Sequence, residues 1–243
     1  MKIIEKIKNK QSDLNAFSPV TIAFIGDSVT QGCFECYLKE GNGIGTIFTP
    51  QYSFCERVKE VLNILYPSAQ VNIINSGISG DNATNGLKRL ERDVLKYSPD
   101  LVVVGFALND STWGEEGIEG YVTSIRAILE KVLSSGAEGI LLTPNMMNVS
   151  TSDHLKDELF LRLSKEFAEI QKGGMLGRYV EAEKGVAAEL GVPVCDIYEQ
   201  WLRCYKGGVN ITELLANKLN HPIWEIHYYT AIKIVETMFQ EKI

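Results

Sequence analysis

Four short blocks of the sequence carry residues that could act together in chemistry. Ser28 ends a Gly-Asp-Ser sequence, and Gly80 lies in Ile-Ser-Gly-Asp. Asn109 lies in Ala-Leu-Asn-Asp, and His221 precedes a proline. A serine hydroxyl is a weak nucleophile that needs a neighbouring base, usually histidine, and donors for the developing oxyanion. A glycine amide can approach a substrate oxygen closely, and an asparagine amide can donate to the same atom, so these blocks predict ester cleavage by Ser28.

Each block also has a purely structural interpretation. Ser28 could cap a helix, Gly80 could serve a turn, and Asn109 could form an Asx-turn. The chain has 3 histidines, which leaves few candidates for a base. We expect His227, which follows His221 at helical spacing, to be a structural or supporting residue. The combination of all four blocks favours the catalytic interpretation.

The elements that must position these blocks alternate between strands and helices. Short apolar runs rich in β-branched residues predict strands buried on both faces, and the segments between them carry apolar residues at helical spacing. Ligands bind at the carboxyl ends of the strands in such a sheet, where three of the four blocks lie. We therefore expect a doubly wound α/β fold. The predicted strands are 20–25, 71–75, 101–104, 139–143 and 192–195, and the predicted helices are 54–65, 87–95, 118–133, 155–170, 176–190 and 224–239.

The whole chain is expected to form one domain. Its 243 residues contain no repeat and no linker-like stretch, and residues 1–18 are expected to form an amino-terminal helical extension. Residues 32–52 and 145–154 are longer than minimal connections. Long loops on a compact scaffold often carry function, so we expect both to be loops that serve as lids or substrate walls.

Composition excludes several kinds of partner. The formal net charge of -7 without a basic cluster argues against nucleic-acid binding. No apolar stretch approaches the roughly 20 residues of a membrane span, so no stable membrane insertion is expected. Charged residues interrupt positions 1–10, so we expect no secretory signal and a cytoplasmic chain. The oligomeric state stays open.

The cysteines are expected to be reduced and structural. Their number, 5, is odd, which argues against a disulfide framework. Cys33 and Cys36 have the spacing of zinc ligands, but a structural zinc site needs a second pair. Cys195 and Cys204 do not supply one. We expect small, partly buried thiols, no metal site and no cofactor.

In these blocks the chain resembles the SGNH hydrolases, also called the GDSL lipase/esterase family, over about residues 20–240. The resemblance implies a flavodoxin-like three-layer α/β/α sandwich with a five-stranded parallel sheet. It also implies that Ser28 attacks the acyl carbon and that His221 takes and returns the proton. The backbone N–H groups of Ser28 and Gly80, with the Asn109 side chain, would hold the oxyanion.

The chain departs from the family at one position. Members usually place an aspartate three residues before the histidine to orient its ring, and here that residue is Lys218. A lysine cannot accept a hydrogen bond from an imidazole N–H. We expect a Ser28–His221 dyad whose ring is held by a backbone carbonyl near Lys218, by Glu225 or by Asp196. Further residues expected to contact substrate or support the site are Asp27, Asp81, Asp110, Trp224 and Glu225.

The substrate is expected to be a small-molecule or carbohydrate ester. Family members act on short-chain esters, lysophospholipids, thioesters and acetylated sugars. Aromatic residues in 32–52, together with Trp113 and Trp224, could stack on a sugar ring. This favours removal of short acyl groups, mainly acetyl, from a carbohydrate or small metabolite. The alternatives are a lysophospholipase or thioesterase, and a non-catalytic module that binds acylated sugars.

Overall fold

A five-stranded parallel sheet forms the centre of the molecule. The computed structural model describes residues 1–41 and 43–240. The strand order is β4-β1-β5-β6-β7, which is the 2-1-3-4-5 order of flavodoxin-like folds and confirms the expected class. After β1, the chain adds β4 on one side of it and then β5 on the other. The strands are β1 (Val20–Gly26), β4 (Val71–Gly77), β5 (Leu101–Gly105), β6 (Glu138–Leu142) and β7 (Val194–Cys195).

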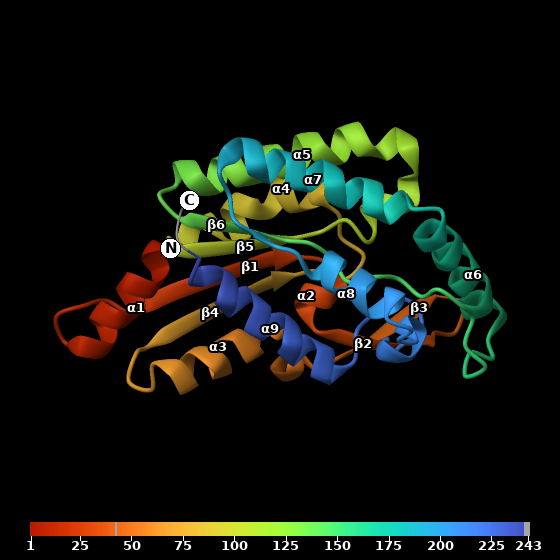
Figure 1. Cartoon of the computed structure of the whole chain (residues 1–243), viewed down its shortest axis with the longest axis horizontal. Coiled ribbons are helices and arrows are strands. Elements are labelled where there is room, and N and C mark those ends of the chain that lie inside the picture. Colours follow the sequence, from red (N-terminus) through yellow and green to blue (C-terminus); the bar gives the residue numbers. More distant parts are fainter. Residues whose placement is uncertain (42, 241–243) are drawn as a thin grey trace.

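Helices cover both faces of this sheet, as Figure 1 shows. One layer contains α3 (Phe54–Leu65) and α9 (Trp224–Met238), which pack on each other. The other contains α4 (Ala83–Asp93), α5 (Ile118–Ser134) and α7 (Met175–Leu190). The expected three layers are therefore present. The apolar core lies between them because the central strands are buried on both faces.

Some expected helix boundaries differ from the structure. Helix α4 begins four residues earlier than expected, because the Asn82 side chain caps it by accepting from the Asn85 amide at 3.0 Å. Helix α6 (Glu158–Lys172) begins later than expected, and α8 (Ile197–Lys206) was not predicted. The short 3-10 helices are η1 (Pro50–Tyr52), η2 (Leu95–Tyr97), η3 (Asp110–Trp113), η4 (Glu115–Gly117) and η5 (Ile211–Leu214).

The amino-terminal segment lies at the amino ends of the strands. Helix α1 (Lys2–Ser12) ends six residues before the expected boundary, because the Asp13 side chain turns the chain by accepting from two following amides. The Ile3 amide donates to Glu138 at the start of β6, and Lys6 pairs with Asp100 before β5. This segment is thus remote from the carboxyl ends of the strands.

The segment 32–52, expected to be a loop, contains an antiparallel hairpin instead. Its strands are β2 (Cys33–Leu38) and β3 (Ile44–Phe48), with a register shift between Cys33 and Glu35. Short strands with a bulge give little periodicity, which explains why the pattern of the sequence did not reveal them. Residues 145–154 contain no helix or strand, as expected. None of the helices in the described ranges combines the length and apolarity that crossing a membrane requires.

Candidate active site

Ser28 is the first residue of a short helix directly after β1. This helix, α2 (Ser28–Gln31), is capped by Asp27, whose carboxylate accepts from the Val29 amide at 2.9 Å. The amide of a first helical residue has no partner within its helix, so the Ser28 N–H is available to a ligand. The Ser28 side chain is buried. The sequence thus folds into a tight strand-to-helix turn that fixes the serine.

His221 meets Ser28 from the opposite end of the chain. The Ser28 Oγ and His221 Nε2 atoms lie 2.9 Å apart, in hydrogen-bond contact. The turn carrying the ring is shaped by Asn217, whose Oδ1 accepts from the amides of Leu219, Asn220 and His221 at 3.1, 3.0 and 2.9 Å. Sequence reasoning missed Asn217, although asparagine is a residue that commonly organises such turns.

The other ring nitrogen, Nδ1, faces an amide and a thiol. Asn217 Nδ2 lies 3.0 Å from it and Cys36 Sγ lies 3.9 Å from it. Since the Asn217 oxygen is occupied by three backbone amides, its NH₂ group must face the ring. At 3.0 Å this group can donate to Nδ1 when the ring carries its proton on Nε2, and when Nδ1 carries the proton only the sulfur can accept it. Cys36 was not predicted to contribute to the site.

The expected acceptors for the ring lie elsewhere, which corrects the earlier hypothesis. Lys218 turns toward Glu213 and pairs with it at 2.8 Å. Asp196 caps α8 and pairs with Lys184 at 2.9 Å, while Glu225 is exposed at the start of α9. No backbone carbonyl among the described residues accepts from Nδ1 either. Residues close in sequence or acidic in type were favoured because the hairpin carrying Cys36 was not predicted.

Gly80 and Asn109 lie at the same edge of the sheet, and Asn109 bonds to the residue that follows Gly80. Gly80 adopts φ +77, and a Cβ atom there would meet nothing within 4 Å, so the residue borders open space. Its amide makes no hydrogen bond within the described residues. Asn109 Nδ2 donates to the Asp81 carbonyl at 2.8 Å, which leaves its second amide hydrogen available.

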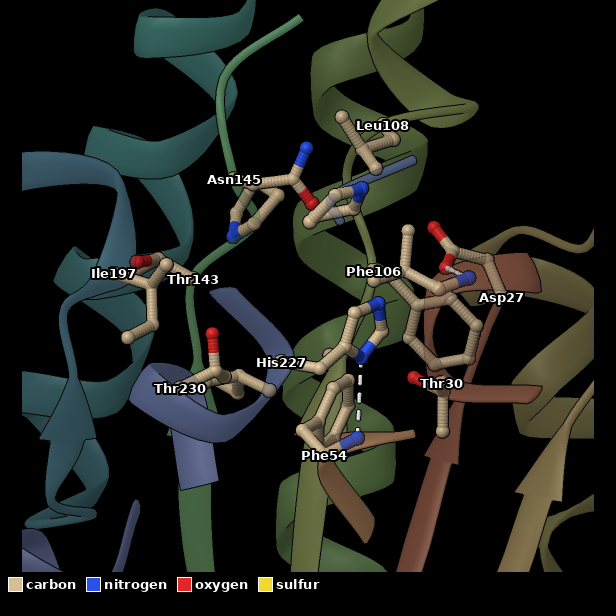
Figure 2. Close-up of a pocket in the computed structure, with 15 residues that line it drawn as sticks. Asp27, Thr30, Phe54, Phe106, Leu108, Thr143, Asn145, Ile197, His227 and Thr230 are labelled. Atoms are coloured by element: carbon tan, nitrogen blue, oxygen red, sulfur yellow. Dashed lines mark hydrogen bonds between the residues drawn. The ribbon is translucent and has the colours of Figure 1, made fainter. Parts of the chain in front are cut away.

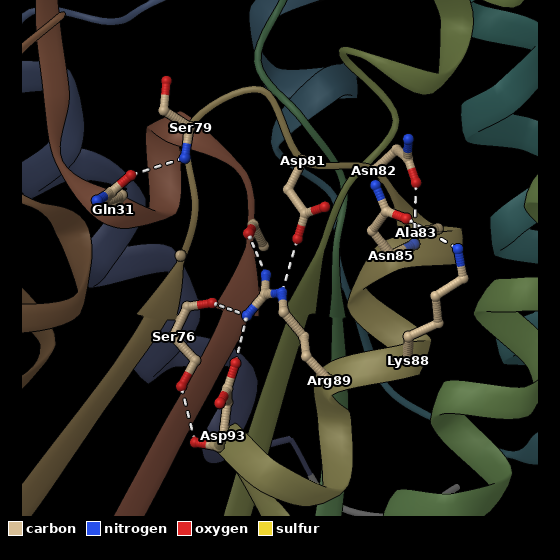
Figure 3. Close-up of polar contacts among 12 residues, drawn as sticks. Gln31, Ser76, Ser79, Asp81, Asn82, Ala83, Asn85, Lys88, Arg89 and Asp93 are labelled. Atoms are coloured by element: carbon tan, nitrogen blue, oxygen red, sulfur yellow. Dashed lines mark hydrogen bonds and ion pairs between the residues drawn. The ribbon is translucent and has the colours of Figure 1, made fainter.

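A buried arginine connects the turns that carry Ser28 and Gly80 (Figure 3). Arg89 Nε donates to Asp81 Oδ2 at 2.7 Å, and its two terminal nitrogens donate to the Ser76 and Gly26 carbonyls at 2.6 and 2.9 Å. Asp81 is thus the acidic partner of this arginine, and its role in supporting the site stays a prediction. Arg89 was missed because an arginine on an otherwise amphipathic helix usually faces solvent.

Two buried aspartates brace the neighbouring turns. Burial raises the pKa of Asp27 and that of Asp110 to about 6. Asp110 accepts from the Ala83 amide at 3.0 Å and from the Ala107 amide at 3.1 Å. Ala107 has φ +91, a strained conformation for an L residue, and Asp110 stabilises it beside Asn109.

Two tryptophans close in sequence to the catalytic blocks expose their rings. Trp224 is half-exposed and stacks on Tyr52 with ring centroids 4.4 Å apart, and its edge meets Phe34. Trp113 is 71% exposed in η3, just after Asn109. Trp224 therefore packs on the hairpin through Phe34, and Trp113 offers a second exposed ring; that either ring contacts substrate stays a prediction.

His227 is a core residue rather than a base. Its Nδ1 accepts from the Phe54 amide at 3.1 Å, and Figure 2 shows the ring among Asp27, Thr30 and Thr230. Burial lowers its pKa to about 3, so the ring stays neutral. The mainly apolar cavity that it lines measures about 30 Å³, room for about one water.

Two cysteines form an unexpected cluster with His221. The Sγ atoms of Cys33 and Cys36 and a ring nitrogen of His221 all lie within 4.8 Å of one another. The sequence did not reveal this cluster, because a hairpin and a turn distant in sequence converge here. The contact between the two thiols lowers the pKa of Cys36 and, with burial, raises that of Cys33. Both thiols are free of disulfides.

Comparisons with known proteins agree with this architecture. A model of the GDSL-like lipase/acylhydrolase family matches residues 24–227. An acetylxylan esterase of Geobacillus stearothermophilus is 26% identical over 162 residues, covering 61% of this chain and 71% of that protein.

Solved structures show the same fold. Axe2, an acetylxylan esterase from Geobacillus stearothermophilus, superposes with a TM-score of 0.67 at 21% identity, covering 93% of this chain and 97% of that one. A two-domain esterase active on acetylated mannans gives a TM-score of 0.64 at 22% identity, covering 97% of this chain and 52% of that one. Catalytic variants of Axe2 replace a serine or an aspartate by alanine.

Proposed function

The chain belongs to the GDSL-like lipase/acylhydrolase family and is a carboxylic ester hydrolase, and we propose that it removes acetyl groups from a carbohydrate through Ser28 and His221. The observation that carries this proposal is the 2.9 Å contact between Ser28 Oγ and His221 Nε2. A nucleophile and a base in direct hydrogen-bond contact, with the base held by its own turn, are the parts that acyl transfer requires.

Acylation requires the tautomer of the neutral His221 ring that carries its proton on Nδ1 and leaves Nε2 free to accept. Ser28 Oγ attacks the ester carbonyl while Nε2 takes the serine proton, and Nε2 then gives that proton to the leaving alcohol. The acetyl group is left on Ser28, and water attacks it by the same route in reverse. The Nδ1–H points toward Cys36 Sγ, the one acceptor that its surroundings offer within the described residues.

The oxyanion is held by donors from three segments. The amides of Ser28 and Gly80 have no partner among the described residues, and Asn109 keeps one amide hydrogen for the substrate. Donors fixed in place before the reaction stabilise developing charge without reorganisation. Arg89 acts on this hole as a positioning residue because it holds both turns.

The hollows around the site favour a polar substrate. The mainly apolar cavity of about 30 Å³ is lined by neither Ser28 nor His221, so it does not limit the length of the acyl group. Two larger and more polar hollows, of about 550 and 500 Å³, include Asn217 and Cys36 in one and Asp110 and Trp113 in the other. Polar groups and exposed aromatic rings suit a sugar. The names of the esterases similar to this chain support the same substrate class.

A panel of esters tests this function. We expect acetylated xylo- or manno-oligosaccharides and p-nitrophenyl acetate to be cleaved, with rates falling as the acyl chain lengthens. Ser28→Ala should lower kcat by at least about 10³-fold, whereas the exposed control Ser68→Ala should not. A fluorophosphonate should label Ser28.

Two results would contradict the proposal in different ways. Faster cleavage of lysophospholipids or long-chain thioesters would overturn the acetyl-carbohydrate assignment while leaving the nucleophile intact. An absence of both turnover and a Ser28 adduct would indicate a binding module without catalysis.

A further inference from the structure

Three side chains with metal-ligand atoms converge on the far side of the His221 ring from Ser28. The two sulfurs of Cys33 and Cys36 and a nitrogen of His221 lie within 4.8 Å of one another. Cys33 is fully buried and His221 is 4% exposed, while Cys36 is partly accessible. Cys36 also lines the hollow of about 550 Å³. A ligand could therefore reach the cluster from this hollow.

The bulge in the hairpin is what brings the two thiols together. In a regular strand, residues three apart point to opposite faces. Here Cys33 pairs with Phe48 and Cys36 pairs with Thr46, so the partners are two residues apart and lie on one face of β3. Phe34 is the extra residue that produces this shift. Both sulfurs consequently face the same side, toward His221.

We propose that Cys33, Cys36 and His221 Nδ1 form a binding site for Zn²⁺. Thiolate and imidazole ligands favour zinc over magnesium, calcium or manganese, which prefer oxygen. Zinc takes sulfur at about 2.3 Å and nitrogen at about 2.0 Å in a tetrahedron, so its ligands lie roughly 3.5–4 Å apart. The observed spacing needs only small side-chain movements to reach that geometry. Water from the hollow completes the coordination, and both thiol protons pass to solvent.

Zinc at this site switches off the base. Coordination uses the Nδ1 lone pair, so a neutral His221 ring must carry its proton on Nε2, which faces Ser28. A protonated Nε2 cannot take the serine proton. Zinc binding requires the Asn217 NH₂ group, now 3.0 Å from Nδ1, to shift away from the ring while it keeps its hydrogen bond to Asn220 Oδ1. The site is therefore inhibitory, a consequence that rests on the proposed function, whereas zinc binding itself does not.

Direct binding measurements test the site. We expect reduced, chelator-treated protein to bind one Zn²⁺ per chain, measured by metal analysis after gel filtration. Cd²⁺ should give a thiolate-to-metal absorption band. Cys33→Ser and Cys36→Ser should each weaken binding by at least about 10-fold, since even losing a residue that only orients a ligand costs that much. Cys204→Ser, an exposed cysteine on α8, is the matched control and should bind as the wild type does.

Protection from alkylation tests the same ligands in the wild type, in case a variant fails to fold. Zinc should slow iodoacetamide labelling of Cys36, read by mass spectrometry, and leave Cys204 labelling unchanged. In the activity assay, zinc should inhibit the wild type and EDTA should restore its rate. The inhibition of each variant is expressed relative to the rate of that same variant without metal. The site is disproved by a wild type that binds no Zn²⁺, or by a folded Cys33→Ser/Cys36→Ser variant that binds it equally well. Zinc bound at these cysteines without inhibition would disprove the switch.

Discussion

The imidazole of His221 has a sulfur where serine hydrolases commonly use a carboxylate. Cys36 Sγ lies 3.9 Å from Nδ1, a long contact, and sulfur is a weak hydrogen-bond acceptor. The Asn217 turn supplies much of the ring's orientation instead, by fixing the backbone of His221. Cys36 can thus favour the Nδ1–H form of the ring, whereas the Asn217 NH₂ group, 3.0 Å from the same nitrogen, favours the Nε2–H form.

Replacing this sulfur tests its role. We expect Cys36→Ala to lower kcat by about 10-fold with little change in KM, because the productive tautomer loses its acceptor. Cys36→Asp should recover the lost rate, since a carboxylate can accept the same proton. The rates are measured with chelator present, so that metal binding does not contribute.

The control for this pair is Cys204→Ala, which removes a thiol far from the ring and should leave kcat unchanged. A Cys36→Ala variant as active as the wild type would show that Asn217 alone suffices to orient His221. A Cys36→Asp variant that fails to exceed Cys36→Ala would argue against acceptance by this side chain.

At the scale of elements, helix α2 packs directly on the end of β4. A Cβ atom on Gly77 would lie 2.2 Å from the Gln31 backbone nitrogen, so no side chain fits there. We expect Gly77→Ala to push α2 away and displace Ser28, which lowers kcat. The free energy of unfolding should also fall, by about 1–3 kcal/mol. Thermal unfolding and ester hydrolysis measure the two effects.

Gly185→Ala provides the matched control, because a Cβ atom there meets nothing within 4 Å on an exposed part of α7. It should keep full activity and gain up to about 1 kcal/mol of stability from its higher helix propensity. Equal effects of the two substitutions would contradict the steric account.

Helix α4 contributes through Arg89, which bonds to the turns after β1 and β4. We expect Arg89→Lys to lower kcat more than it raises KM, because lysine keeps the charge opposite Asp81 but cannot reach both carbonyls. Leaving a buried carbonyl unpaired costs about 1–3 kcal/mol, so the melting temperature should also fall. Arg92 on the same helix has a side chain that is 70% exposed, so Arg92→Lys is the control and should change neither kcat nor the melting temperature. A folded Arg89→Lys enzyme with wild-type kcat would refute the positioning role.

At the scale of the whole molecule, the strand order decides where the site forms. Strands β4 and β5 flank β1, so the chain reverses its direction of winding beside β1. The turns after these three adjacent strands carry Gly80, Asn109 and Ser28. A crevice opens at such a switch point, because consecutive connections leave it on opposite faces of the sheet.

Global stability should depend on pH through a buried acid in the α5–α7 layer. Glu183 is fully buried and accepts from the Tyr121 hydroxyl, and burial raises the pKa of Glu183 well above its ordinary value. The folded state therefore binds this proton more tightly than the unfolded state. The stabilisation of the fold by this bound proton is complete at pH values below the pKa of Glu183 in the unfolded state. It is lost as the pH rises toward the pKa of Glu183 in the folded state, by at most about 1.4 kcal/mol per pH unit.

Glu183→Gln removes this titration. We expect the stability of the variant relative to the wild type to improve as pH is raised from 4 to 8, measured by urea unfolding. The exposed Glu181→Gln on the same helix should show no comparable trend. A pH-independent difference between Glu183→Gln and the wild type would mean that Glu183 is not held protonated by burial.

Local residue patterns were enough to predict the parallel sheet and the polar blocks that follow its strands. Continuous β-branched runs and helical spacing depend on local burial, and Ser28 and Gly80 each lie in a recognisable turn. Residue runs and helical spacing do not reveal which segments distant in sequence come into contact. Only the tertiary structure brought Cys36 and Asn217 to the ring, placed Arg89 between two turns, and turned Lys218 away. These contacts depend on a bulge, a loop path and helix packing, for which single residue types and spacings give no signal.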